Sequence, residues 1–284
     1  MKLKNMLTQS IIFLLCFVAL SLWGFYWAIW PLKIISPITP ENFKLPYENV
    51  AIQTSDNIII RGWFIPNANP NAKAIILLHG YPADKGNILP SRYFLHQKYS
   101  LLFIDFRYLG ESGGKYSTVG KNEVLDVLAA IHYLRSRNIH EVGIWGFSLG
   151  GAVALMSAIN VPEIKAIVAE APYAQLDKMA DDYFRIPLLK YPLGGLLRFW
   201  AWLFLGYDLK NVSPVKSASQ LKIPILIMHS KHDHVVSFEH AELFRQQLKN
   251  KSNVQFLFFE DLPHGQASQY YEKIITNFFD KNLQ

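Results

Sequence analysis

The chain has 284 residues, of which 51% are hydrophobic, with a net charge of +6 and a single cysteine. This length suffices for one α/β domain with its own core plus a short appendage, and one cysteine excludes an internal disulfide framework. The positive charge favours anionic lipid surfaces, but no basic run is dense enough to indicate a nucleic-acid-binding protein.

The first predicted element is a long apolar helix. No charged residue occurs between Met6 and Pro31, and Ile11 to Trp30 has about the length that a helix needs to cross a bilayer. A cleavable signal peptide is the competing interpretation, but its apolar region would be shorter and would end at small residues. This run ends in tryptophan and tyrosine residues, which favour the membrane interface. Residues 7–30 are therefore predicted to be an uncleaved transmembrane anchor, followed by a linker over 31–47.

The orientation of this anchor depends on a thin asymmetry of charge. Lys2, Lys4 and the amino group precede the helix, whereas Lys33 and Lys44 follow it. Positive charge is retained on the cytoplasmic side of a membrane. The pattern therefore favours a single-pass membrane protein whose N-terminus lies in the cytoplasm. The domain after the anchor would then lie outside the cytoplasm, in a periplasmic or lumenal compartment.

Residues 48–284 alternate between predicted strands and helices. Two strands come first, at Val50 to Thr54 and at Ile58 to Ile65, and a shorter apolar run ends at Leu78. A helix over Glu123 to Arg137 keeps its apolar residues on one face. Alternation of this kind predicts a mostly parallel sheet with helices on both faces.

The segment Gly146-Phe147-Ser148-Leu149-Gly150 has the form G-x-S-x-G, between a short apolar strand and a helix of small residues. In that setting it predicts a nucleophile elbow, where glycines allow a turn too sharp for a Cβ and Ser148 Oγ is lifted above the sheet. The alternative is a glycine-rich turn that holds a serine by chance. A serine hydroxyl needs an imidazole to take its proton and a carboxylate to orient that imidazole.

Both groups occur downstream of the elbow. Asp233 lies in the loop beyond the predicted strand Pro224 to His229. His264 lies in the loop beyond the next predicted strand, Val254 to Phe259. The order serine, aspartate, histidine, each at the carboxyl end of a parallel strand, suits a catalytic triad on such a sheet. Glu170, at the end of an earlier strand, is the alternative acid.

Acyl transfer also needs two N–H donors for the negative charge that develops on the substrate carbonyl oxygen. One predicted donor is the backbone N–H of Leu149, directly after Ser148. The other is the N–H of Tyr81, in the loop after Leu78, where Gly80 lets the backbone approach closely.

Histidines gather around Asp233 in the sequence, at positions 229, 232, 234 and 240. Such a cluster could bind zinc. However, His229 ends a strand, Asp233 is needed to orient His264, and no further pair has the spacing of metal ligands. We therefore expect neither a metal nor a cofactor.

These motifs together resemble those of the α/β-hydrolase superfamily, and within it the serine hydrolases of the Bem46-like and serine-aminopeptidase-like groups. The resemblance covers roughly residues 48 to 280 and depends on the elbow, the final histidine and three further motifs, His79-Gly80, Asp105 to Gly114 and His229 to Val236. It implies the α/β-hydrolase fold, with a mostly parallel sheet of about eight strands, helices on both faces and a short cap insertion. One residue departs from the family pattern: Tyr108 stands where glycine usually follows the arginine of a D-x-R segment.

The cap implied by this resemblance would occupy residues 172–214, where strand and helix stop alternating and aromatic residues and leucines dominate. A second membrane span is a poor interpretation, because Lys190 and Arg198 would lie deep in hydrocarbon and Pro192 would break the helix. We expect the apolar side of the cap to line an acyl pocket or to dip into the membrane interface beside the anchor. The plainer alternative is that its aromatic residues pack on the core.

The predicted function is a membrane-anchored serine hydrolase that cleaves lipophilic carboxylic esters or thioesters through an acyl-enzyme, although transfer of the acyl group to an alcohol also fits. Its partners would be a small acyl ester and the lipid around the N-terminal helix, with no nucleic acid. The rival is a serine aminopeptidase for short peptides, in which Asp177, Asp181 or Asp182 holds an amino group. We expect these three residues to form a solvated helix face instead. A binding protein on the same fold is the third interpretation, and it usually lacks the nucleophile or the histidine.

Overall fold

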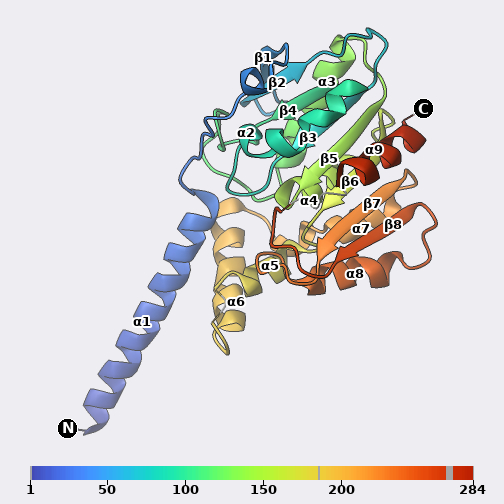
Figure 1. Ribbon diagram of the computed structural model, residues 1–284. Helices are drawn as coiled ribbons and strands as arrows, with labels where there is room; N and C mark the ends of the chain where they lie inside the picture. The colour runs from blue at the N-terminus through green and yellow to red at the C-terminus, as the bar shows by residue number, and fades with distance from the viewer. Residues whose placement is uncertain (1, 185, 267–270, 284) are drawn as a thin grey trace. The chain divides into compact units, whose positions relative to one another are not determined.

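The chain forms two compact units in the computed structural model (Figure 1). The structure describes residues 2–184, 186–266 and 271–283. The larger unit contains the sheet, and the smaller one joins the N-terminal helix to an insertion. The larger unit comprises 32–174 and 213–284, and the smaller one 1–31 and 175–212.

One sheet of eight strands organises the larger unit. The strand order is β1-β2-β4-β3-β5-β6-β7-β8, and the last six strands in this order are parallel, which confirms the predicted α/β-hydrolase fold with a mostly parallel sheet. β2 is antiparallel to both of its neighbours. The strands are β1 (Glu48–Gln53), β2 (Ile59–Ile65), β3 (Ala74–Leu78), β4 (Ser100–Ile104), β5 (Val142–Phe147), β6 (Ile164–Glu170), β7 (Ile225–Ser230) and β8 (Val254–Phe259).

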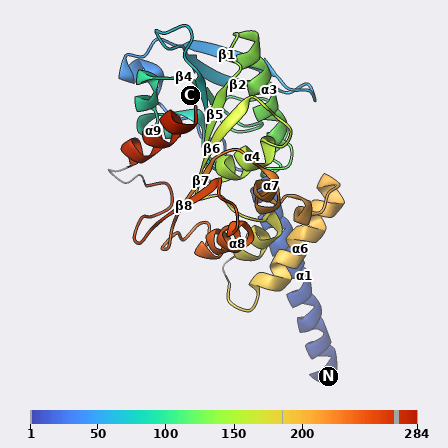
Figure 2. The same ribbon diagram turned by 90° about the vertical axis from the view of Figure 1, so that its right-hand side faces the viewer.

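Helices cover both faces of this sheet. Figure 2 shows α9 on one side of the strands and α3, α4 and α7 on the other. Short helical turns complete the side that carries α9. The helices of the larger unit are α2 (Lys85–Ile88), α3 (Glu123–Ser136), α4 (Leu149–Ser157), α7 (Pro214–Gln220), α8 (Phe238–Leu248) and α9 (Tyr271–Asn282), with 3-10 turns η1 (Pro40–Phe43), η2 (Leu89–Ser91) and η3 (Tyr93–Gln97).

The core lies where α9 packs on the central strands. Every residue of β3 and β4 is buried, because both strands are covered on their two faces. On one face Trp145 of β5 belongs to the same buried cluster as Ile275 and Phe279 of α9. A Cβ at Gly143 would lie 2.7 Å from the Phe279 ring, so glycine is what allows this close approach. The sheet is thereby a rigid base for the loops at its edge.

The smaller unit consists of α1 (Lys2–Ile29) and the insertion, which contributes four further elements. By length and composition α1 could cross a membrane, with a mean hydropathy of 2.1, and a signal sequence would meet the same test. α6 packs against both α1 and α5. The elements of the insertion are α5 (Leu176–Asp182), α6 (Lys190–Trp200), the π-helical turn η4 (Ala201–Leu205) and the 3-10 turn η5 (Leu209–Asn211).

Candidate active site

Ser148 lies in a sharp turn between β5 and α4, with a φ of 52° and a ψ of −113°. A residue with a Cβ rarely adopts this conformation, so the surrounding structure must hold it there. A Cβ at Gly146 would lie 2.1 Å from the Gly150 carbonyl oxygen, and a Cβ at Gly150 would lie 2.5 Å from the Leu78 carbonyl oxygen. Only glycine fits either position. The turn therefore has the geometry that the G-x-S-x-G pattern predicts.

The loop after β3 lies against this turn. A Cβ at Gly80 would lie 2.9 Å from the Phe147 ring and 3.3 Å from Ser148 Cβ. Tyr81 therefore follows a residue that touches the elbow, and Leu149 begins α4 directly after Ser148. The chain segments that carry the two predicted oxyanion donors meet at the serine. Their role as donors stays a prediction.

Asp233 and His264, which are 31 residues apart in the sequence, form a hydrogen bond. His264 Nδ1 lies 2.6 Å from Asp233 Oδ2. The other oxygen, Asp233 Oδ1, accepts the backbone N–H groups of Val235 (2.8 Å) and Val236 (2.9 Å). The His264 ring packs on Phe147, the residue before Ser148, with 4.7 Å between the ring centroids. The structure thus brings the predicted acid and base to the elbow.

The charge state of Asp233 follows from these contacts. Burial by itself would raise the pKa of Asp233, but the hydrogen bond with His264 and the two backbone N–H groups outweigh it and lower that pKa. Asp233 is therefore an anion that only accepts hydrogen bonds. His264 must donate its Nδ1 proton to Asp233, which leaves the Nε2 lone pair available to accept a proton.

Glu170, the alternative acid, is committed to other partners. Its Oε2 atom accepts hydrogen bonds from Arg92 Nη2 at 2.6 Å and from Trp145 Nε1 at 3.0 Å. The Arg92 guanidinium also stacks over the Trp145 ring, 3.5 Å from its centroid. All three residues are buried. No pattern in the sequence indicated this cluster. It binds the end of β6 to the segment around η2. Asp233 is therefore the acid that contacts His264.

A buried histidine holds the loop that precedes Tyr81. His79 Nδ1 lies 2.7 Å from the Gly80 carbonyl oxygen, and its Nε2 accepts the backbone N–H of Phe106 at 3.0 Å. Because Nε2 accepts a hydrogen bond, the ring carries its one proton on Nδ1 and is neutral. Burial also lowers the pKa of His79, which favours the neutral ring. The sequence analysis singled out His79 only as part of a motif, and the structure gives it this positioning role.

The loop after β4 is fixed by ion pairs of Asp105 and Arg107. Asp105 accepts hydrogen bonds from Lys85 Nζ at 2.7 Å and from the Glu111 backbone N–H at 2.9 Å. Arg107 binds the buried Asp126 at 2.8 Å. Tyr108 adopts a φ of 68°, a left-handed conformation that favours glycine, which explains why the family pattern has glycine there.

The histidines around Asp233 point to separate partners. His229 Nε2 lies 2.9 Å from the Val236 carbonyl oxygen, and His240 Nδ1 accepts the Ala174 backbone N–H at 3.0 Å. Within residues 2–184, 186–266 and 271–283, no three side chains of histidine, cysteine, aspartate or glutamate are grouped as metal ligands would be. These histidines support the loops structurally.

The cap aspartates differ from the expected solvated face. Asp181 Oδ1 accepts a hydrogen bond from Arg198 Nη1 at 2.6 Å, and Arg198 also donates to the Asp177 carbonyl oxygen. Asp182 faces Lys190 at 3.7 Å. The prediction was wrong for Asp181 because its cationic partner lies 17 residues away, on another helix.

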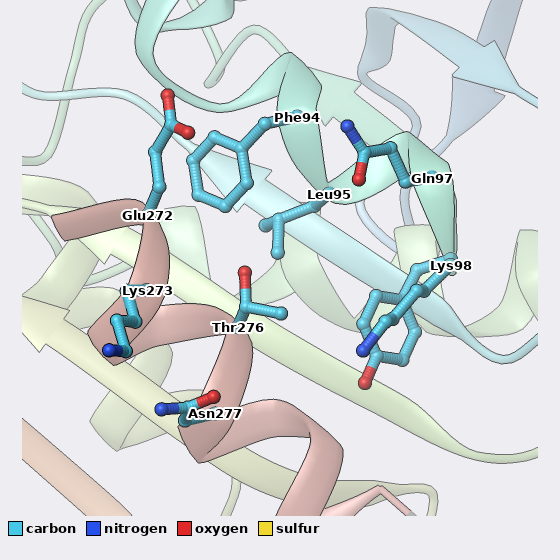
Figure 3. Close-up of a pocket in the computed structure, with 9 residues that line it drawn as sticks. Phe94, Leu95, Gln97, Lys98, Glu272, Lys273, Thr276 and Asn277 are labelled. Carbon is cyan, nitrogen blue, oxygen red and sulfur yellow. The ribbon is translucent and has the colours of Figure 1, made fainter.

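A separate pocket lies between η3 and α9 (Figure 3), with a volume of about 380 Å³. Lys98 and Tyr99, which line it, directly precede β4, so it belongs to the amino end of that strand rather than to the edge that carries Ser148. Its other lining residues are Phe94, Leu95, Gln97, Glu272, Lys273, Thr276 and Asn277. None of them is a serine, cysteine or histidine, so this pocket is no second candidate for acyl transfer.

A family profile and a solved structure each match this chain over more than half of its length. The sequence profile of the prolyl oligopeptidase family matches residues 91–284. The Pyrococcus furiosus esterase Pf2001 superposes with a TM-score of 0.74 at 28% identity, which covers 89% of this chain and 99% of the esterase.

Two relatives match over a smaller share of their own length. The Bacillus subtilis protein YqkD, which is described as uncharacterized, is 30% identical over 191 residues, or 64% of this chain and 62% of YqkD. The Thermotoga maritima esterase EstD is 24% identical over 236 residues, or 70% of this chain and 56% of EstD. The matched region therefore spans less than two thirds of either relative.

Proposed function

Since the chain belongs to the prolyl oligopeptidase family and has the α/β-hydrolase fold, we propose that it is a membrane-anchored serine hydrolase that cleaves lipophilic carboxylic esters and thioesters. The observation that carries this proposal is the partly buried hydrogen bond between His264 and Asp233 beside the strained serine turn. A base that is oriented by an anion, next to a serine at a helix N-terminus, is the arrangement that acyl transfer needs.

In the proposed reaction Ser148 Oγ attacks the substrate carbonyl carbon while His264 Nε2 takes the hydroxyl proton. The tetrahedral intermediate collapses when His264 returns this proton to the leaving alcohol or thiol, which leaves an acyl group on Ser148. Water then attacks the acyl-enzyme by the same route and releases the acid. Asp233 stabilises the imidazolium that forms in each half of the reaction, and its lowered pKa keeps it anionic.

The negative charge on the carbonyl oxygen would be held by the N–H groups of Tyr81 and Leu149. Gly80 supports this assignment, because its contact with Ser148 brings the loop after β3 to the elbow. Backbone donors of this kind cost no reorganisation during the reaction, since His79 and the start of α4 already fix them.

Two relatives favour an ester over a peptide as the substrate. Pf2001, which covers 89% of this chain at 28% identity, is an esterase, and EstD is another. An aminopeptidase would need a free carboxylate for the substrate's amino group. Asp181 and Asp182 already face cations of the cap, which leaves Asp177, whose Oδ1 atom has no hydrogen-bonding partner among the described residues, for that role. The family name keeps a peptidase as the second candidate.

Anchoring through α1 is the remaining part of the proposal. Its length and hydropathy support a membrane span. Fractionation of cells that express the full chain tests this part: it should remain in the membrane pellet after a carbonate wash, and release into the wash would contradict an integral anchor. A reporter fused after Gln284 would test the extracytoplasmic orientation.

The hydrolase activity is tested with the full chain in detergent and two variants, Ser148→Ala and Ser157→Ala. Ser157 is a matched control, because it is a buried serine of α4 whose hydroxyl donates a hydrogen bond to the Val153 carbonyl oxygen of the same helix. The substrates are p-nitrophenyl esters of increasing acyl length and a panel of aminoacyl nitroanilides.

We expect ester turnover that rises with acyl length, persists in Ser157→Ala and is lost in Ser148→Ala. Nitroanilide turnover without ester turnover would move the assignment to a peptidase. Ester turnover that survives in Ser148→Ala would contradict the proposed nucleophile.

A further inference from the structure

The insertion covers one end of α1. Residues Ser21, Gly24, Phe25 and Ile29 are buried, whereas the earlier turns of the helix are exposed. A polar contact fixes the position: Trp200 Nε1 donates a hydrogen bond to Ser21 Oγ at 3.0 Å. One turn further along both helices, Phe25 stacks on Phe204 with 5.9 Å between centroids. α1 and the α6–η4 segment therefore run side by side in the same direction.

Glycine makes this packing close. A Cβ at Gly24 would lie 2.5 Å from the Phe184 ring. Small residues at a helix contact let backbones and rings approach as membrane helices often do. The covered stretch of α1, Ser21 to Ile29, is also the stretch whose tryptophan and tyrosine residues favour a membrane interface.

The charges of α6 are neutralised inside the smaller unit. Arg198 donates to Asp181 at 2.6 Å, and Lys190 lies 3.7 Å from Asp182. Two cations on an apolar helix would otherwise oppose contact with lipid. Their pairing removes much of the objection that the sequence raises against a membrane environment for this segment.

The remaining surface of α6 and η4 is an exposed apolar stripe. It consists of side chains spaced three, four or eight residues apart, with Leu203 beside Trp202, so that they share one side of the helix. Apolar area of this kind is unfavourable in water and marks an interaction surface. Its large members are Tyr191 (61% exposed), Phe199 (45%), Trp202 (61%) and Leu203 (50%).

We propose that this stripe lies in the lipid bilayer, at the interface and the adjoining acyl-chain region of the leaflet that holds the C-terminal end of α1. The occupant of the surface is lipid, because the stripe continues the exposed apolar surface of a helix that is itself long and apolar enough to span a membrane.

This inference rests on the anchoring part of the proposed function and deepens its substrate class. An enzyme whose cap is inserted in a leaflet meets acyl esters that are dissolved in that leaflet. The expected substrates are therefore membrane-dissolved acyl esters rather than freely soluble ones.

The test is site-directed spin labelling of the full chain in vesicles of mixed phosphatidylcholine and phosphatidylglycerol. The natural Cys16 on α1 reports the anchor itself. On a Cys16→Ser background, Phe199→Cys and Trp202→Cys report the stripe. Lys178→Cys is the matched control, because it is an exposed charged position on α5 of the same insertion.

Labels at residues 16, 199 and 202 should collide readily with oxygen and poorly with a water-soluble nickel complex, and the label at 178 should do the reverse. A water-exposed label at 199 and 202 together with a lipid-exposed label at 16 overturns the inference and leaves the anchor intact. A water-exposed label at 16 contradicts the anchor as well. Turnover of p-nitrophenyl acetate, measured on the same samples, reports the hydrolase proposal separately.

A second variant tests the consequence for substrate. Trp202→Lys places an unpaired charge in the stripe, which would oppose its insertion. Turnover of a long-chain ester dissolved in the vesicles should fall by about tenfold or more, whereas turnover of p-nitrophenyl acetate should not change. Equal turnover of the vesicle-bound ester by both proteins would contradict a lipid-inserted cap.

Discussion

The edge of the sheet that carries Ser148 buries polar side chains, whereas the insertion exposes apolar ones. At the edge Asp233, His229 and Glu170 are all buried, and each has a hydrogen-bonding partner. On the insertion Trp202 and Leu203 are exposed although both are apolar. Burial of a charge is costly unless it is paired, so the edge is built for chemistry. Exposure of large apolar groups marks an interaction surface instead, and we propose lipid as its occupant.

Two ion pairs show the same contrast. Arg92 to Glu170 and Arg198 to Asp181 are both 2.6 Å long. The side chains of the first pair are 4% and 5% exposed, and those of the second are 29% and 22% exposed. Equal distances therefore do not imply equal contributions to stability, because the energy of a pair depends on the solvent around it.

The largest expected effect distinguishes the two acids of the edge. Asp233→Asn removes the anion that orients His264, so kcat/KM for a p-nitrophenyl ester should fall by about 10⁴-fold. Glu170→Gln alters the acid that contacts Arg92 and Trp145. It should leave the kcat/KM of the folded protein within about tenfold of the wild-type value. Steady-state kinetics on both variants checks this. A larger loss in Glu170→Gln would reverse the assignment of the catalytic acid.

The next effect compares a glycine from each unit. Gly150→Ala would place a Cβ 2.5 Å from the Leu78 carbonyl oxygen and should destabilise the protein by about 3 kcal/mol or more. Gly195→Ala, on α6, meets nothing nearer than 3.9 Å and should stabilise the helix by up to about 1 kcal/mol. Urea unfolding of the full chain in detergent measures both. Equal midpoints would contradict the strained elbow.

The two ion pairs provide a third comparison. Arg92→Met removes the cation from the buried Glu170 carboxylate, which keeps its hydrogen bond from Trp145, and should cost about 3–5 kcal/mol in the free energy of unfolding. Arg198→Met breaks a partly exposed pair and should cost about 1 kcal/mol or less. The same unfolding experiment applies. A greater loss from Arg198→Met than from Arg92→Met would mean that water reaches the Arg198 pair less than its exposed fraction indicates.

The smallest effect is a dependence on pH that comes from two buried histidines of the larger unit. Burial lowers the pKa of both His79 and His229, so each stays neutral in the folded protein and takes up a proton on unfolding in acid. Their stabilisation is complete above the usual histidine pKa of about 6.5 and is lost as the pH falls below it. Each histidine should contribute up to about 1.4 kcal/mol per pH unit to the slope. Unfolding of His79→Gln between pH 8 and pH 5 should therefore show a shallower slope than the wild type, and an equal slope would contradict a neutral buried His79.

The sequence predicts the sheet and the elbow well, because both depend on local patterns. The glycines at 146 and 150 are needed for steric reasons that act within a few residues, and the apolar runs of the strands reflect burial on both faces. Chain order then places Asp233 and His264 at the same edge. The subgroup within the superfamily, the roles of the oxyanion donors and the predicted domain boundaries stay predictions.

Long-range polar partners could not be predicted in this way. Arg92 lies 78 residues from Glu170, and Lys85 lies 20 residues from Asp105, so no periodicity connects them. The contact between Trp200 and Ser21 joins positions 179 residues apart. A position beside the anchor was one of three interpretations of the cap. Composition alone could not select it, because aromatic residues suit a core, an acyl pocket and a membrane interface equally.

The most direct test of the central claim, that Ser148 is the nucleophile activated by His264, is covalent labelling with a fluorophosphonate followed by peptide mass analysis. A single adduct on the peptide that contains Ser148 is predicted, with a labelling rate about 10³-fold lower or less in His264→Ala. An adduct on another serine, or an unchanged rate in His264→Ala, would contradict the proposed catalytic site.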